Sequence, residues 1–270
     1  MKQYFYESEL VKQSIENNKR LSKRDFYDTR DISVELNTLK NAEGSCFLTL
    51  GKTEVVAGVK MAIETPYPDN PDEGSISVGV ELSPMSDPNF DMGPPSALAV
   101  ELSRVVDRSI RESKGIDFKK LCIKEGKYVW MIFVDIVVIN NDGNLFEACE
   151  LAALAALKNA RFPQIELTED SCTIIKGEHT DKYLEVSNNP ILFNFVKIND
   201  KILLDPDYYE DMAATSRFSV TITNDKKIVA IQKGEQGSFT VDEIKEMVHK
   251  AINSYKEVYS KLEKAMKASK

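Results

Sequence analysis

The stretch from Tyr128 to Ala160, YVWMIFVDIVVINNDGNLFEACELAALAALKNA, decides the fold class. Its first part, Tyr128 to Ile139, is a β-branched and aromatic run that predicts a strand buried on both faces. Asn141-Asp142-Gly143-Asn144 predicts a turn. Residues 145–160 are rich in alanine and leucine almost all round, which predicts a helix buried on several sides. A long buried strand that leads into a buried helix indicates a globular protein with a sizeable core.

Short strands and a few helices are predicted on both sides of this unit. Upstream strands are expected at 32–36, 46–50, 54–63 and 74–82, with a hairpin turn at Gly51-Lys52, and a helix runs from Pro94-Pro95-Ser96 to Lys114-Gly115. Downstream strands are expected near 172–175, 191–196, 201–204, 217–223 and 227–232. Terminal helices are expected over about 9–18 and about 240–266, the second after a Thr240-Val241-Asp242-Glu243 capping box. Because strands collect in groups before helices, we expect an α+β fold in one compact domain over residues 1–270.

Composition and charge exclude several classes of protein. The 270 residues are 42% hydrophobic and 29% charged, as in ordinary globular proteins. The N-terminus does not have the pattern of a secretory signal, and the longest apolar run is interrupted by Asp135 and is shorter than the ~20 residues that span a bilayer. We therefore expect a cytoplasmic chain without membrane contact. The net charge of −8 argues against a broadly basic nucleic-acid binder, so any RNA contact must be local.

Cysteine and histidine give little support for a metal or cofactor site. Cys46, Cys122, Cys149 and Cys172 are scattered among apolar residues without a C-x-x-C pair, which favours buried thiols over disulfides or zinc. His179 and His249 are far apart, and His249 is expected on the surface of the final helix. Gly51-Lys52-Thr53 is not a phosphate-binding loop, because Cys46 stands where that motif needs glycine.

Three arginines on the first long helix are candidates for phosphate binding. Arg104, Arg108 and Arg111 follow one another at i, i+4 and i+7, opposite an apolar stripe, so their guanidinium groups could contact successive phosphates. The alternative is a solvated face on which Glu101 and Glu112 pair with the arginines.

Two aspartates are candidates for catalysis. Asp205 and Asp211 lie in an acidic loop expected between strands, where they could hold a divalent ion or act as general acid. The alternative is a surface turn, since Asp-Pro is common in turns.

In order and spacing, these segments resemble the ribonuclease PH family over nearly the whole chain. The resemblance is carried by Arg24-Asp25-x4-Arg30, Asn41-Ala42-Glu43-Gly44-Ser45, Gly51-x-Thr53, Glu101-Leu102-Ser103-Arg104, the Asp142-Gly143-Asn144 turn with its helix, Leu204-Asp205 and Glu210-Asp211-Met212. It implies a ribonuclease PH-like fold (ribosomal protein S5 domain 2-like) of duplicated β-β-α units. It also implies assembly into a six-membered ring, and active members degrade RNA from the 3′ end with phosphate. No cofactor is implied.

Departures from the family pattern indicate a subunit that does not catalyse. Gly143-Asn144-Leu145 stands where active members carry a Gly-Ser-Arg that holds phosphate, and leucine cannot replace that charged contact. Ala97-Leu98 replaces a pair of RNA-binding arginines, and the stretch Ala213 to Arg217 lacks further acidic residues expected there. Asp205 and Asp211 remain as vestigial acidic positions. This pattern resembles the non-catalytic partner in archaeal exosome rings.

The resemblance also implies partners and a mode of action. A non-catalytic subunit alternates with a catalytic paralogue in a heterohexameric ring, under S1/KH-type RNA-binding cap proteins, and acts on single-stranded RNA. Arg104 and Arg108 match arginines that reach toward the partner's active site, and Arg111 extends this set by helical geometry. Two alternatives stay open. The chain could itself be an active phosphate-dependent 3′-to-5′ exoribonuclease, because it keeps Asp205 and Asp211, or it could be a purely architectural ring subunit.

Overall fold

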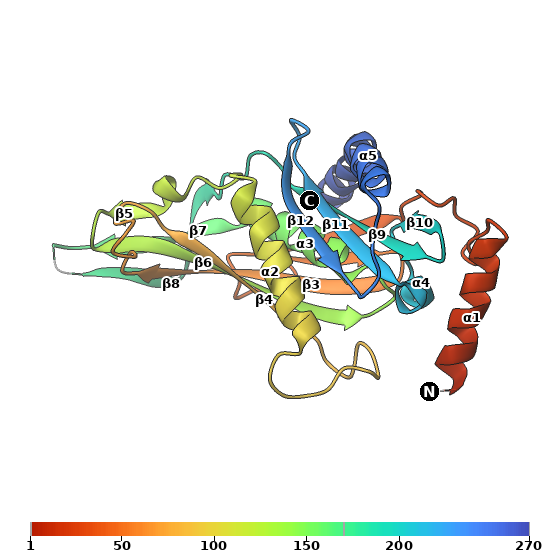
Figure 1. Cartoon of the computed structure of the whole chain (residues 1–270). Coiled ribbons are helices and arrows are strands. Elements are labelled where there is room, and N and C mark those ends of the chain that lie inside the picture. Colours follow the sequence, from red (N-terminus) through yellow and green to blue (C-terminus); the bar gives the residue numbers. More distant parts are fainter. Residues whose placement is uncertain (1, 170, 270) are drawn as a thin grey trace.

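The long strand β6 (Tyr128–Asn140) lies inside a mixed six-stranded sheet (Figure 1). The computed structural model describes residues 2–169 and 171–269. β6 pairs antiparallel with β3 (Thr53–Glu64) on one side and parallel with β4 (Ser75–Glu81) on the other. The sheet is completed by β2 (Gly44–Leu50), β1 (Ile32–Leu36) and the short β5 (Cys122–Lys124). The predicted hairpin at Gly51-Lys52 is confirmed as the antiparallel β2–β3 pair.

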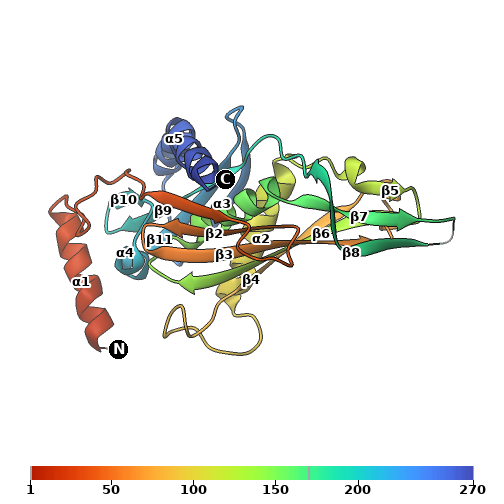
Figure 2. The ribbon, with the colours of Figure 1, turned by 180° about the vertical axis from the view of Figure 1, so that it is seen from behind.

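Two helices cover one face of this sheet, as Figure 2 shows from behind. α3 (Leu145–Lys158) packs against β2, β3 and β6 on one side and against a second sheet on the other, so its residues 145–157 are all buried. This double contact explains its nearly uniform alanine and leucine composition. α2 (Ala97–Glu112) lies against β4 and α3, and Ser96 caps it by accepting a hydrogen bond from the Ala99 N–H. Both helices were predicted from the sequence.

The second sheet has four antiparallel strands in the order β10–β9–β11–β12. Their bounds are Ile191–Ile198 for β9, Lys201–Leu204 for β10, Ser216–Ile222 for β11 and Ile228–Gly234 for β12. The long helix α5 (Val241–Ala268) packs on β9 and β11 and reaches β1 of the first sheet. One hydrophobic cluster includes side chains from both sheets and from α2, α3 and α5.

Two further units extend from opposite ends of the molecule in Figure 1. At one end, β7 (Arg161–Leu167) and β8 (Cys172–Tyr183) form a separate hairpin. At the other end, α1 (Lys2–Glu16) packs against the short helix α4 (Tyr208–Ala213) and buries Val11 and Ile15 in a small second cluster. A 3-10 turn, η1 (Phe118–Leu121), precedes β5.

The structure corrects several predicted elements. The N-terminal helix spans 2–16 rather than 9–18, and the final helix spans 241–268 rather than 240–266. The strand predicted at 172–175 is the start of the longer β8, and its partner β7 was missed because both strands are largely exposed and lack a clear apolar alternation. The prediction that β6 is buried on both faces was wrong. Met131, Phe133 and Val137 are only half-buried, because α2 and α3 cover the other face of the sheet.

The cysteine prediction holds for two of the four thiols. Cys46 and Cys149 are buried, whereas Cys122 and Cys172 are half-buried, and all four are free. His249 is exposed on α5, as predicted. Among the described residues, no helix is long and apolar enough to cross a membrane.

Candidate functional site

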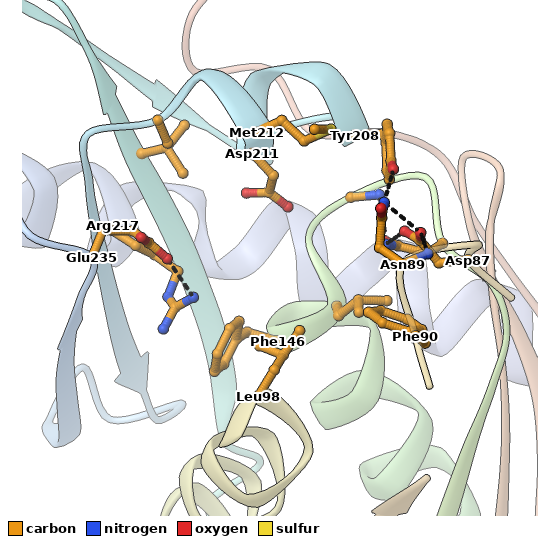
Figure 3. Close-up of a pocket in the computed structure, with 15 residues that line it drawn as sticks. Asp87, Asn89, Phe90, Leu98, Phe146, Tyr208, Asp211, Met212, Arg217 and Glu235 are labelled. Atoms are coloured by element: carbon orange, nitrogen blue, oxygen red, sulfur yellow. Dashed lines mark hydrogen bonds and ion pairs between the residues drawn. The ribbon is translucent and has the colours of Figure 1, made fainter. Parts of the chain in front are cut away.

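A cavity of about 250 Å³ opens at the N-terminus of α3, between α4, β11 and the start of α2 (Figure 3). Its walls are largely apolar, with a few polar and charged groups at the edges. The lining residues are Asp87, Asn89, Phe90, Leu98, Asn141, Gly143, Leu145, Phe146, Val196, Tyr208, Asp211, Met212, Ala214, Arg217 and Glu235. The cavity therefore brings together Asn141 and Gly143 of the turn, Leu98, Asp211 and Arg217, which are separated widely in the sequence.

One N–H group at the N-terminus of α3 is already bound by a carboxylate of the protein itself. Asn144 adopts the left-handed conformation, with φ 56°, and its backbone N–H donates to Asp211 Oδ2 at 2.7 Å. The next two residues, Leu145 and Phe146, are 5% and 3% exposed and form part of the cavity wall. A helix N-terminus ordinarily offers free N–H groups to an anion. Here Asp211 accepts from the Asn144 N–H, and apolar side chains follow it.

Asp211 extends from α4 toward the cavity. Burial raises the pKa of its carboxyl to about 7, although the N–H of Asn144 and the charges of Arg217 and Arg30 act in the opposite direction. A carboxyl group with this pKa exchanges its proton near neutral pH.

Asp205 has a different environment, although it is linked to the same asparagine. Its carboxylate is fully buried and accepts hydrogen bonds from Arg30 Nη2 at 2.8 Å, Arg24 Nη1 at 2.9 Å and Asn144 Nδ2 at 2.7 Å. Burial alone would raise its pKa, but Arg30 and Arg24 hold it below the usual value. Asp205 does not line the cavity. The two aspartates predicted as one acidic site are therefore a cavity group and a buried structural anion.

The loop predicted around these aspartates is partly helical, which corrects the expectation of an acidic loop between strands. Asp207 caps α4 by accepting from the Glu210 N–H, and Glu210 accepts from the Asp207 N–H in return. Glu210 is also bound by the buried Arg20, whose Nη2 lies 2.5 Å from its Oε2. Sequence reasoning missed Arg20, because nothing in its charged surroundings distinguishes it from solvated arginines. Its partner lies 190 residues away.

Arg217 is the only cation among the described residues that line the cavity. It is 7% exposed, and its guanidinium lies 4.0 Å from the centre of the Phe146 ring. Its Nη2 lies 2.6 Å from Glu101 Oε1, and its Nη1 lies 3.8 Å from Glu235 Oε1. Two carboxylates thus already neutralise this arginine.

The three arginines predicted as one face of α2 differ in their environments. Arg104 is exposed and makes no hydrogen bond or ion pair with the residues that the structure describes. Arg108 is exposed and donates to Gln232 Oε1 of β12 at 2.9 Å. Arg111 is half-buried, pairs with Asp107 at 2.8 Å and donates to the backbone oxygen of Ile76 in β4 at 2.6 Å. The guanidinium group of Arg111 is therefore bound by other parts of the protein. The guanidinium group of Arg104, and that of Arg108 apart from one hydrogen bond, can still bind a ligand.

The carboxylates predicted to pair with these arginines are used differently. Glu101 binds Arg217 of β11 rather than an arginine of its own helix. Asp107, and not a glutamate, forms the ion pair with Arg111.

Among the described residues, no group of three or more His, Cys, Asp and Glu side chains is arranged to hold a metal ion.

Known proteins similar to this chain point to one family. Family models described as the 3′ exoribonuclease family, domains 1 and 2, match residues 28–163 and 188–254. The exosome complex component Rrp42 of Methanothermobacter thermautotrophicus is 42% identical over 252 residues, covering 93% of this chain and 92% of that protein. The same component of Thermoplasma volcanium is 43% identical over 248 residues, covering 92% of each chain.

Solved structures agree with the sequence relatives. A chain of the Archaeoglobus fulgidus exosome with RNA bound to the active site matches with a TM-score of 0.86 and 34% identity, covering 97% of this chain and 99% of that chain. Rice Rrp46 matches with a TM-score of 0.68 at 18% identity, covering 92% and 100%, and this second likeness concerns the fold alone. The predicted ribonuclease PH-like α+β fold is confirmed. The chain belongs to the ribonuclease PH family of 3′ exoribonucleases.

Proposed function

We propose that this chain is a ring subunit of an archaeal exosome that holds RNA for a catalytic paralogue and does not itself catalyse phosphorolysis. Relatives that cover nine-tenths of the chain are exosome components, and the solved structures that it resembles include archaeal exosome cores. In this proposal the chain alternates with its catalytic paralogue in a hexameric ring. Single-stranded RNA and S1/KH-type cap proteins are the further partners, and the complex acts in the cytoplasm.

The cavity at the N-terminus of α3 carries the non-catalytic half of the proposal. Phosphorolysis needs inorganic phosphate to be held by hydrogen-bond donors and positive charge while it attacks the RNA backbone. In this cavity the Asn144 N–H already donates to Asp211, Leu145 presents an apolar side chain, and Arg217 is paired with Glu101. The carboxylates of Asp87 and Glu235 at the edges would repel a phosphate dianion.

The exposed arginines of α2 carry the RNA-holding half. Arg104 and Arg108 present guanidinium groups to solvent from one rigid helix whose opposite face is buried. A guanidinium group can donate two parallel hydrogen bonds to the oxygens of one phosphate. Such a contact does not depend on the base sequence. We expect Arg111 to contribute less, because Asp107 cancels its charge locally and Ile76 fixes its direction.

The decisive experiment compares the purified chain with the complex that it forms with its catalytic paralogue. We expect no phosphate-dependent release of nucleoside diphosphates from the chain alone and full activity from the complex. Replacing Arg104 and Arg108 together by alanine should weaken RNA binding to the complex by about tenfold or more, since each phosphate contact contributes to affinity. The matched control replaces Lys256 and Lys264, two exposed cations of α5, by alanine. Unchanged RNA binding in the arginine variant would contradict the RNA-holding role and would favour a purely architectural subunit.

One observation favours a second candidate function, in which the chain is itself a phosphorolytic exoribonuclease. Asp211 faces the cavity with a pKa of about 7, which suits a general acid. Phosphate-dependent activity of the chain alone that disappears in Asp211→Asn would establish this function.

A further inference from the structure

A line of side-chain contacts connects the cavity with one of the proposed RNA-binding arginines. Arg217 of β11 donates to Glu101 Oε1 of α2 at 2.6 Å. The same oxygen lies 3.3 Å from Gln232 Nε2 of β12, and the other end of that amide accepts from Arg108 Nη2 at 2.9 Å. Glu101 and Gln232 therefore join a buried arginine to an exposed one.

The buried end of this line is held firmly. Arg217 stacks on Phe146, and its strand β11 pairs with β12, which carries Gln232. A Cβ atom at Gly234, opposite Arg217 in the register, would lie only 2.2 Å from Arg217 Nη2. The guanidinium thus occupies the space that glycine leaves open. Glu101 is therefore anchored to the body of the protein, and through it so is the Gln232 amide.

We propose that Gln232 is a positioning residue, which orients the Arg108 guanidinium for an RNA phosphate while leaving its charge intact. This inference rests on the proposed function. An amide accepts one hydrogen bond from an arginine without neutralising it, so Nε and Nη1 keep their donors for a phosphate. Asp107 acts differently on Arg111, because a carboxylate both orients the guanidinium and cancels its charge. A pre-oriented arginine loses less side-chain freedom when it binds RNA.

The test measures single-stranded RNA affinity and phosphorolysis kinetics of the complex with its catalytic paralogue. Gln232→Ala should weaken binding about threefold, as expected for the loss of one orienting hydrogen bond. KM for RNA should rise by a similar factor with kcat unchanged, because a saturating concentration of RNA compensates for weaker binding. In an Arg108→Ala background, Gln232→Ala should have no further effect. Gln164→Ala, at an exposed position of the β7–β8 hairpin, is the matched control.

Gln232→Glu provides an independent readout, because the side chain keeps its size but gains a charge. The new carboxylate would pair with Arg108, so the dependence of log affinity on log salt should become shallower by about 0.7, the value for one lost phosphate contact on a single strand. An unchanged slope would show that Arg108 does not contact an RNA phosphate, and the inference would then fail.

The outcomes separate the inference from the proposed function. If Arg108→Ala weakens RNA binding but Gln232→Ala does not, the positioning role is refuted and the proposed function stands. Equal losses from Gln232→Ala with and without Arg108 also refute the positioning role. If Arg108→Ala itself changes nothing, both the RNA-holding role of Arg108 and the inference fail.

Discussion

The opposite environments of Asp205 and Asp211 lead to opposite predictions for the same substitution. Asp205→Asn should strongly destabilise the protein, whereas Asp211→Asn should be tolerated near pH 5 and should stabilise it at higher pH. Both changes replace a carboxylate by an amide of nearly the same shape. Any difference between their effects on the free energy of unfolding therefore comes from the loss of the charge and from its surroundings.

The magnitude for Asp205 follows from its partners. Its carboxylate is fully buried between Arg24 and Arg30, and an amide would leave the charges of both arginines without this anion. Breaking a buried ion pair from one side typically costs about 3–5 kcal/mol. Because the pKa of Asp205 is lowered in the folded state, its contribution is present above the ordinary pKa of 3.8 and disappears as pH falls through the lower folded pKa.

For Asp211 the sign is reversed. Its pKa is raised to about 7, so its stabilising contribution is complete below 3.8 and is lost as pH rises through 7. Asparagine never carries the buried charge and can still accept from the Asn144 N–H. We expect Asp211→Asn to exceed the wild type slightly at pH 5, where the unfolded carboxyl is already ionised, and by roughly 1–3 kcal/mol at pH 8, less than the full shift implies because the residue is partly exposed.

Urea unfolding of the wild type and both variants at pH 5, 7 and 8 measures these differences as changes in the free energy of unfolding. Equal destabilisation by the two substitutions at all three pH values would refute this reasoning. So would an Asp205→Asn protein as stable as the wild type, because the arginine cluster would then not depend on that anion.

Three further predictions concern other parts of the molecule. The pKa of Glu150 is raised to about 8, chiefly by burial, so wild-type stability should fall between pH 5 and 8, and Glu150→Gln should flatten this dependence in urea unfolding by roughly 2 kcal/mol. Gly44→Ala should cost roughly 3 kcal/mol in thermal unfolding, because its Cβ would lie 2.5 Å from the Ala156 oxygen, whereas Gly79→Ala in the same sheet should be far milder. Arg111→Ala should weaken RNA binding by the complex less than Arg108→Ala does, and an equal or larger loss would contradict the assignment of Arg111 to Asp107.

The sequence predicted the elements whose signals are local and repeated. The strand at β6, the helices α2, α3 and α5 and the β2–β3 hairpin all follow from periodicity, caps or turn residues within one segment. The apolar identity of Leu145 at the start of α3 was equally visible, because it is a matter of residue identity. Elements without such signals were missed or misplaced, namely α4, β7 and the true extent of α1.

Only the tertiary structure decided what each charged residue does. Helical spacing predicts the same environment for Arg104, Arg108 and Arg111, but α2 is flanked by β12 and β4. Arg108 therefore donates to the neutral side chain of Gln232 in β12, and Arg111 donates to the backbone oxygen of Ile76 in β4. Asp205 and Asp211 are six positions apart, yet arginines far away in the sequence surround one while the other faces the cavity. Such differences depend on contacts between segments that lie from 35 to 181 residues apart in the sequence. The residues next to a side chain in the sequence therefore do not predict these contacts.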